Sequence, residues 1–154
     1  MASSHNTGKT LADALPLIQQ SLAQGESVRF TPGGTSMLPM LRPDRDVVTL
    51  SPLPQRLKKY DLPLYCRTDG QFVLHRVVKV GDTYTCIGDH QFQKETGLRH
   101  EQMIGLVTEF VREGKTVKVT HWRYRLYCRV WHHSRFLRRC WLKLRRIFSK
   151  GKKK

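Results

Sequence analysis

The sequence predicts a mostly β domain with one N-terminal helix and a basic, amphipathic C-terminal helix. Three observations predict this class. An early segment has apolar residues at helical spacing, the middle of the chain alternates apolar and polar residues between turn signals, and the last part combines helical spacing with many basic residues. We therefore divide the 154 residues into a disordered leader (1–9), a folded domain (10–120) and a basic amphipathic tail (121–154).

The N-terminal helix is predicted to run to about Ala23, with Gly25 as a stop signal. Two starts remain open. Thr10 and Asp13 resemble a capping box, whereas a start at Asp13 would place Pro16 in an early turn, where proline is tolerated. The apolar residues at helical spacing are Leu11, Leu15, Ile18 and Leu22.

The rest of the domain is predicted to be β structure, because its apolar segments alternate and are separated by Gly, Pro and Asp. Asp69-Gly70 lies between two such segments and is a strong hairpin signal. Further turns are expected at 80–83 and 113–115. The expected strands cover 27–31, 46–50, 61–67, 71–80, 84–88, 103–112 and 116–120.

The net charge of +16 is concentrated in the tail. Residues 121–154 contain thirteen Lys and Arg and no Asp or Glu, which leaves fifteen basic and twelve acidic residues for the rest of the chain. The folded body is therefore close to neutral, and the charge of the whole chain does not by itself indicate nucleic-acid binding by the domain.

The tail has one apolar helical face among arginines and lysines, and three interpretations stay open. It can lie on an anionic membrane surface, pack on the β domain, or bind nucleic acid with Trp122, Trp131 and Trp141 stacking on bases. Membrane contact through residues 121–154 is the favoured interpretation and nucleic acid the least favoured. The residues of this face are Tyr127, Val130, Trp131, Leu137, Trp141, Leu144 and Phe148.

The cysteines and the hydropathy pattern bear on cofactors and location. Cys66, Cys86, Cys128 and Cys140 form no C-x-x-C pair and have no zinc-site spacing, so we expect reduced thiols and no metal, with a Cys66–Cys86 bridge as the alternative. No segment has the ~20 apolar residues of a spanning helix, and the chain does not open on a secretory signal. We expect a cytoplasmic or peripherally membrane-associated protein.

Three side chains suggest acyl-transfer chemistry. Ser36 follows a Gly33-Gly34 turn, where the backbone can approach a substrate closely. His75 lies in an apolar segment expected to be a strand, and a partly dry imidazole can act as a neutral base that removes the proton of a serine hydroxyl. Asp89 follows Gly88 on a turn and is expected to orient the imidazole.

The motifs Ser36-Met37-x-Pro39, His75-Arg76 and Gly88-Asp89, in this order, resemble those of the type I signal peptidase family of serine proteases. In that family the position of His75 is lysine in the bacterial-type branch and histidine in the endoplasmic-reticulum and archaeal-type branch, so this chain resembles the histidine branch. The self-cleaving repressors share the fold but use lysine as the base. The similarity runs from about Arg29 to Arg112 and implies a coiled β-sheet domain.

The resemblance also implies a reaction and a mode of substrate binding. Ser36 would be the nucleophile and His75 its base, with no metal or cofactor, and the peptide or preprotein substrate would bind as an extended strand beside the site. Gly34, Thr35, Met37 and Leu38 are the candidate substrate-binding residues, although Met37 and Leu38 are equally suited to core packing. Arg76 is expected to point to the opposite face and form a structural salt bridge.

The chain departs from the family pattern at three points. His90 stands where the third motif usually has Asn, which would change the hydrogen bonds around Asp89. Gly34 replaces a serine that often assists the oxyanion hole, so that Thr35 or backbone N–H groups would have to serve. The third is the lack of the transmembrane anchor that is common among the relatives.

These observations predict a signal peptidase-like serine endopeptidase that cleaves extended peptide or leader segments through a Ser36–His75 dyad. Two alternatives remain. One is a catalytically silent binding protein that acts through its basic tail on a membrane surface or nucleic acid. The other is a self-processing regulator, whose autocleavage would depend on Ser36.

Overall fold

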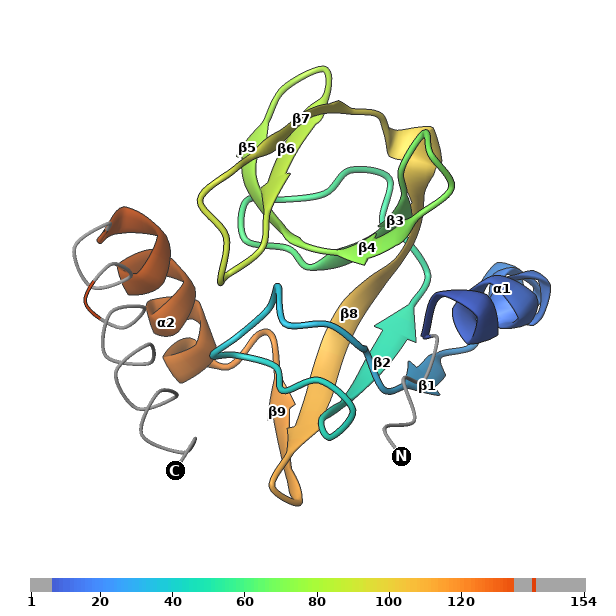
Figure 1. Cartoon of the computed structure of the whole chain (residues 1–154), viewed down its shortest axis with the longest axis horizontal. Coiled ribbons are helices and arrows are strands. Elements are labelled where there is room, and N and C mark those ends of the chain that lie inside the picture. The colour runs from blue at the N-terminus through green and yellow to red at the C-terminus, as the bar shows by residue number, and fades with distance from the viewer. Residues whose placement is uncertain (1–6, 135–139, 141–154) are drawn as a thin grey trace, which may run out of the picture.

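The computed structural model describes residues 7–134 and residue 140 of the chain. They form a mixed α/β structure of two mostly antiparallel sheets with a helix at each end of the chain, and the two helices lie on opposite sides of the molecule (Figure 1). Helix α1 covers Thr7–Ala23 and helix α2 covers Trp122–His133. The coarse prediction of β structure between an N-terminal and a C-terminal helix is therefore confirmed.

The larger sheet is built around one long strand, β8 (Met103–Arg112). Strand β2 (Val47–Ser51) pairs along β8, and β1 (Val28–Phe30) pairs with β2. Strand β3 (Pro63–Cys66) pairs with the first part of β8 and β9 (Lys115–Lys118) with its last part. Strand β4 (Phe72–Leu74) pairs with β3 and ends the sheet at this side.

The smaller sheet contains β5 (Arg76–Val80), β6 (Tyr84–Ile87) and β7 (Glu95–Leu98), in this order. A short 3-10 helix, η1 (His100–Gln102), then leads into β8. Backbone bonds from Tyr60 N to Val77 O (2.7 Å) and from Val77 N to Asp61 O (2.9 Å) tie β5 to the segment before β3. The smaller sheet is therefore anchored to the larger one close to the point where the chain crosses between them.

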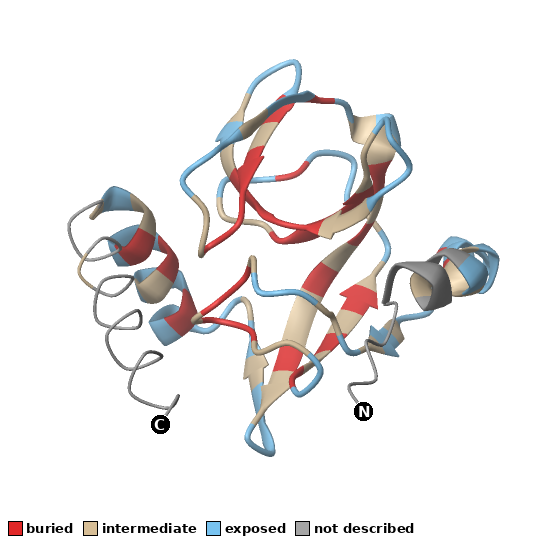
Figure 2. Ribbon diagram, in the orientation of Figure 1, coloured by how far each residue is buried: buried red, intermediate tan, exposed pale blue. Residues whose placement is uncertain are grey.

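Two apolar clusters stabilise these sheets, because each buries side chains from strands that are distant in sequence. The first lies between α1, the larger sheet and α2, and includes Leu22, Leu50, Phe110 and Tyr124. The second lies under the smaller sheet and includes Tyr65 and Val77, which are fully buried. Colouring by burial shows the buried residues of α2 on the side that faces the sheets (Figure 2).

The elements differ from the sequence-based expectations in three places. The segment 71–80 was predicted as one strand, but it forms β4 and β5 in different sheets, with His75 as the single residue between them. Strand β7 was not predicted, because Glu95–Leu98 lacks apolar alternation. Helix α1 begins at Thr7, so the last three residues of the predicted leader are helical, and Pro16 lies inside the helix.

The prediction for the basic tail (121–154) can be compared with the structure only over α2. Tyr124, Cys128 and Trp131 are buried against the domain, so the packing interpretation holds for this helix. Tyr127 and Trp131 were predicted to share one helical face with Val130. They lie on or beside the packed side, but Val130 is 45% exposed and does not share their face. Of the other residues assigned to that face, Leu137, Trp141, Leu144 and Phe148 lie outside the described residues.

All four cysteines are free, so the alternative Cys66–Cys86 bridge is not formed. Burial raises the pKa of the Cys86 thiol to about 12 and also raises that of Cys128, so both thiols are protonated at neutral pH. Neither helix of the described residues has the length and apolar character needed to cross a membrane.

Candidate active site

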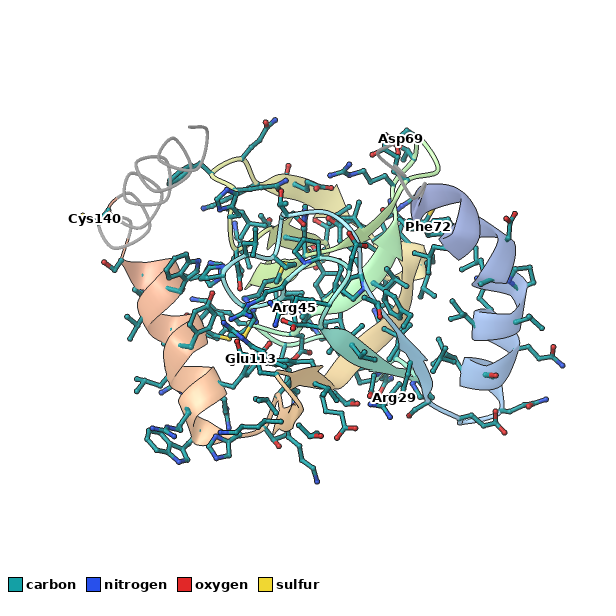
Figure 3. The ribbon with its side chains drawn as sticks, turned by 60° about the horizontal axis from the view of Figure 1, so that its bottom comes forward. Arg29, Arg45, Asp69, Phe72, Glu113 and Cys140 are labelled. Carbon is teal, nitrogen blue, oxygen red and sulfur yellow. The ribbon has the colours of Figure 1, made fainter. Side chains whose placement is uncertain are left out.

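Ser36 and His75 line the same cavity, which has a volume of about 250 Å³. Ser36 comes from the loop between β1 and β2, and His75 from the junction between β4 and β5. The edge strand β4 forms one wall, and the Pro32-Gly33-Gly34 turn forms another. Phe72 and Asp69 mark the hairpin end from which β4 begins (Figure 3).

The turn that contains Gly88 holds the serine and histidine loops together. The backbone N–H of His90 donates to the carbonyl oxygen of Ser36 at 2.8 Å. A Cβ placed on Gly88 would lie 2.7 Å from that same oxygen and 3.1 Å from Nε2 of His75. Only glycine therefore allows this turn to approach both loops, and the Nε2 atom of His75 faces the Gly88 turn.

The other ring nitrogen of His75 is held by two polar side chains. Oε1 of Glu95 lies 3.0 Å from Nδ1, and the hydroxyl of Tyr65 lies 3.2 Å from it. A carboxylate accepts hydrogen bonds but cannot donate them, so Glu95 favours the tautomer with its hydrogen on Nδ1. That tautomer leaves a lone pair on Nε2, the ring nitrogen that faces the Gly88 turn.

Arg67 in turn fixes Glu95 through a two-point contact. Its Nε donates to Oε2 of Glu95 at 2.9 Å, and its NH2 group contacts Oε1. Partial burial disfavours the charged carboxylate, but hydrogen bonds from Arg67 and Tyr65 hold the pKa of Glu95 below its usual value. Glu95 is thus ionised at neutral pH and positioned from one side by Arg67.

The environment of His75 favours the neutral imidazole. The side chain is 2% exposed, and burial lowers the pKa of His75 below 6.5, although the nearby Glu95 carboxylate opposes this shift. An imidazole that is neutral at pH 7 can accept a proton, as a general base must. Burial also raises the pKa of Tyr65, so its phenol remains protonated beside the pair.

Asp89 is buried and lies on the far side of the Gly88 turn, where it binds Arg76. Two parallel hydrogen bonds of 2.9 and 2.8 Å join the guanidinium of Arg76 to both carboxylate oxygens. Burial opposes ionisation, but Arg76 and His132 hold the pKa of Asp89 well below its usual value. The salt bridge expected for Arg76 is therefore present, and both of its partners are fully buried.

Helix α2 completes the surroundings of this ion pair. Asp89 accepts hydrogen bonds from His132 Nε2 at 2.9 Å and from the Tyr127 hydroxyl at 3.1 Å, and its backbone carbonyl accepts one from Trp131 Nε1 at 2.8 Å. Arg76 donates to the hydroxyl of Tyr124 at 2.6 Å. Helix α2 is therefore hydrogen-bonded directly to the turn that touches Ser36 and His75.

The predicted orienting role of Asp89 does not match this arrangement. The carboxylate at Nδ1 of His75 belongs to Glu95, whereas the carboxylate of Asp89 faces Arg76 and α2. The direction of the Arg76 side chain could be predicted from the sequence, because Arg76 directly follows His75 and side chains alternate along a strand. No pattern in the sequence indicated Glu95, because β7 was not predicted.

The predicted substrate-binding residues divide into two pairs. Gly34 and Met37 line the cavity, and Met37 also belongs to the first apolar cluster, so it packs in the core as well as reaching the cavity. Gly34 has a φ of 78°, a left-handed conformation that disfavours the serine of the family pattern. Thr35 is exposed and Leu38 is buried, and neither is among the residues that line this cavity.

Chemically, the site combines a hydroxyl, a neutral imidazole with a held tautomer, an ionised carboxylate and a small cavity beside a sheet edge. Groups of these kinds take part in nucleophilic catalysis on a carbonyl carbon. Within residues 7–134 and residue 140, no three His, Cys, Asp or Glu side chains come together as metal ligands would.

Comparisons of this chain with protein-family models, with curated proteins and with solved structures found no match.

Proposed function

We propose that this chain is a serine endopeptidase with a signal peptidase-like coiled β-sheet domain, in which Ser36 is the nucleophile, His75 the base and Glu95 the residue that positions the base. One observation supports this proposal above the others. The Nδ1 atom of His75 is held by Glu95 and Tyr65, while its Nε2 atom faces the Gly88 turn that binds the backbone of Ser36.

The reaction follows from these positions. Oγ of Ser36 attacks the carbonyl carbon of the scissile peptide bond, and Nε2 of His75 takes the hydroxyl proton. Glu95 stabilises the imidazolium that forms. The C–N bond then breaks as His75 gives the proton to the leaving amine, and the acyl group remains on Ser36. Water attacks the acyl carbon, passes a proton to His75 and releases the carboxylate product, and His75 returns the proton to Ser36.

The negative charge on the carbonyl oxygen needs hydrogen-bond donors in the transition state. The backbone N–H groups of the turn at 34–37 and the hydroxyl of Thr35 are the candidates nearest to Ser36 in the chain. Since Gly34 has no side-chain donor, backbone N–H groups would donate most of the hydrogen bonds to this oxygen.

The substrate is proposed to be an extended peptide that adds a strand to the edge of β4. In the described part of the chain, β4 pairs with β3 on one side and ends the sheet on the other, and Phe72, Val73 and Leu74 line the cavity. Backbone hydrogen bonds to an edge strand bind a peptide in extended form. The resemblance to signal peptidases further implies small side chains beside the scissile bond, as in leader segments of preproteins.

The test is proteolysis by the purified full-length chain of a library of synthetic peptides, with the products identified by mass spectrometry. The wild type and Ser27→Ala should give the same products, because Ser27 is an exposed serine whose hydroxyl contacts Ser51, away from the site. Ser36→Ala should give none of them. Products that persist in Ser36→Ala would contradict the proposal.

A further inference from the structure

The outer face of α2 carries an apolar stripe. Trp122, Leu126 and Val130 are 65, 51 and 45% exposed. They follow one another at intervals of four residues, so they line up along one side of the helix. The molecule exposes few other large apolar side chains in its described part, and those at Leu17 and Phe92 lie on other elements.

The stripe cannot turn inward, because the opposite face of α2 is fixed to the domain. Tyr124, Cys128 and Trp131 are buried there, and Trp131 and His132 are hydrogen-bonded to Asp89. The view coloured by burial shows exposed residues on the side of α2 turned away from the sheets (Figure 2). The stripe therefore stays outside while the helix is folded onto the domain.

Basic side chains accompany the stripe. Arg123, Arg125 and Arg129 are exposed on the same helix, and α2 has no acidic residue. Arg125 and Arg129 also line a cavity of about 410 Å³ beside α2, together with Arg56, Lys58 and Lys59. Asp61 lies in this cavity too, but it is partly buried and accepts a hydrogen bond from the backbone of Lys58.

We infer that the outer face of α2 docks on an anionic lipid bilayer, with Trp122, Leu126 and Val130 among the acyl chains and the arginines beside lipid phosphates. Leu126 and Val130 are aliphatic, so they gain from contact with hydrocarbon but cannot stack on nucleic-acid bases. The cavity lined by Arg125 and Arg129 would receive headgroup phosphate. Residues 135–154 add ten Lys and Arg and no acidic residue to the same segment, which suits a continuous anionic surface.

This inference does not rest on the proposed peptidase activity. Ser36→Ala should bind vesicles as well as the wild type does, so a failure of catalysis and a failure of docking are separate results.

The experiment is the partitioning of the full chain onto vesicles of phosphatidylcholine alone or with about one third phosphatidylglycerol, at about 0.15 M salt, where long-range charge effects are screened. The wild type should bind the anionic vesicles and not the neutral ones. Leu126→Asp/Val130→Asp should weaken this binding by about tenfold or more, because two aliphatic contacts are replaced by charges of the wrong sign.

The control for this variant is Leu17→Asp, which changes an exposed leucine on α1, on the opposite side of the molecule, and should leave binding nearly unchanged (Figure 1). A second pair of variants tests the arginines. Arg125→Glu/Arg129→Glu should also lose binding, whereas Arg29→Glu/Lys115→Glu, with the same change of net charge on exposed positions of β1 and β9, should retain most of it. Arg29 lies on the α1 side of the sheet (Figure 3).

A depth measurement separates docking of α2 from attraction of the remaining basic residues. In a Trp141→Phe background, brominated phosphatidylglycerol should quench the emission of Trp122, and Trp122→Phe should abolish that quenching. If both aspartate substitutions leave binding unchanged, or if Trp122 is not quenched, the inference is overturned. Binding to duplex DNA or RNA in place of vesicles, or self-association lost in Leu126→Asp/Val130→Asp, would overturn it in favour of another partner.

Discussion

Glu95 places its Oε1 atom 3.0 Å from Nδ1 of His75, and Arg67 holds Glu95 from the other side. This relationship gives His75 an ionised partner on one ring nitrogen, while the other ring nitrogen faces the Gly88 turn, where His90 is hydrogen-bonded to the backbone of Ser36. The two acidic residues near the site therefore have different partners. Glu95 holds the Nδ1 atom of His75, whereas Asp89 binds Arg76 and joins the Gly88 turn to α2.

Glu95→Gln should lower kcat/KM by roughly 10²–10⁴-fold, because the imidazolium loses its carboxylate and the amide can hold the wrong tautomer. The measurement is cleavage of a peptide from the library by the wild type and the variant at pH 7. Lys94→Gln is the matched control, since it changes an exposed neighbouring residue. Equal activity of Glu95→Gln and the wild type would show that Glu95 does not act through His75.

The pH dependence of kcat/KM should show an acid limb below pH 6.5. The pKa of His75 is lowered in the folded protein, so the base is neutral above that value and is lost as the pH falls through it. Glu95→Gln should move the limb to still lower pH, because the carboxylate raises the pKa of His75. A limb above pH 6.5, or one that moves upward in the variant, would contradict the assignment of His75 as the base.

Arg76→Met should destabilise the fold by about 3–5 kcal/mol, since it leaves the carboxylate of Asp89 buried without its main partner. The double variant Arg76→Met/Asp89→Asn should lose less than the sum of the two single changes. Urea unfolding of the four proteins measures this coupling. Glu113→Gln, in an exposed ion pair with Arg42, should leave stability nearly unchanged.

Asp89 should also make the free energy of unfolding depend on pH in the acid range. The pKa of Asp89 in the folded protein is below 3.8, the ordinary value for an aspartate. As the pH falls, Asp89 is therefore protonated in the unfolded chain before it is protonated in the folded protein, and the free energy of unfolding decreases. The contribution of Asp89 is complete above pH 3.8 and declines below it. The free energy of unfolding of the wild type should therefore fall more steeply below pH 3.8 than that of Asp89→Asn, and parallel curves would be evidence against an ionised Asp89.

Gly88→Ala should reduce activity more than stability, because the new methyl group meets both Ser36 and His75. Its Cβ would lie 2.7 Å from the Ser36 carbonyl oxygen, so the loops must move apart, at a cost of roughly 1–3 kcal/mol. Gly81→Ala is the control, since its nearest neighbour would be 3.7 Å away. Peptide cleavage and thermal unfolding should be measured together, and full activity of Gly88→Ala would contradict the close approach of these loops.

Much of the framework could be predicted from local pattern. The hairpin at Asp69-Gly70 and the helix that ends at Ala23 are present, because turn residues and helical spacing act over a few neighbours. Ser36 and His75, the two residues of the predicted dyad, line one cavity.

The parts that were missed depend on which sheet a segment joins. Alternation continues across His75, so a two-residue period cannot show that β4 and β5 belong to different sheets. The Gly88-Asp89 turn could be predicted, but not the direction of its carboxylate, which is set by Arg76 and by α2 far along the chain. Glu95 had no pattern to mark it, because β7 is short and mostly polar.

The most direct test of the peptidase account is a mass-spectrometric survey of protein N-termini in cells that carry either the wild type or Ser36→Ala at equal expression. The account predicts new N-termini that are present with the wild type, absent with Ser36→Ala, and preceded by small side chains. Identical N-terminal profiles in the two strains, with both proteins folded and expressed, would contradict it.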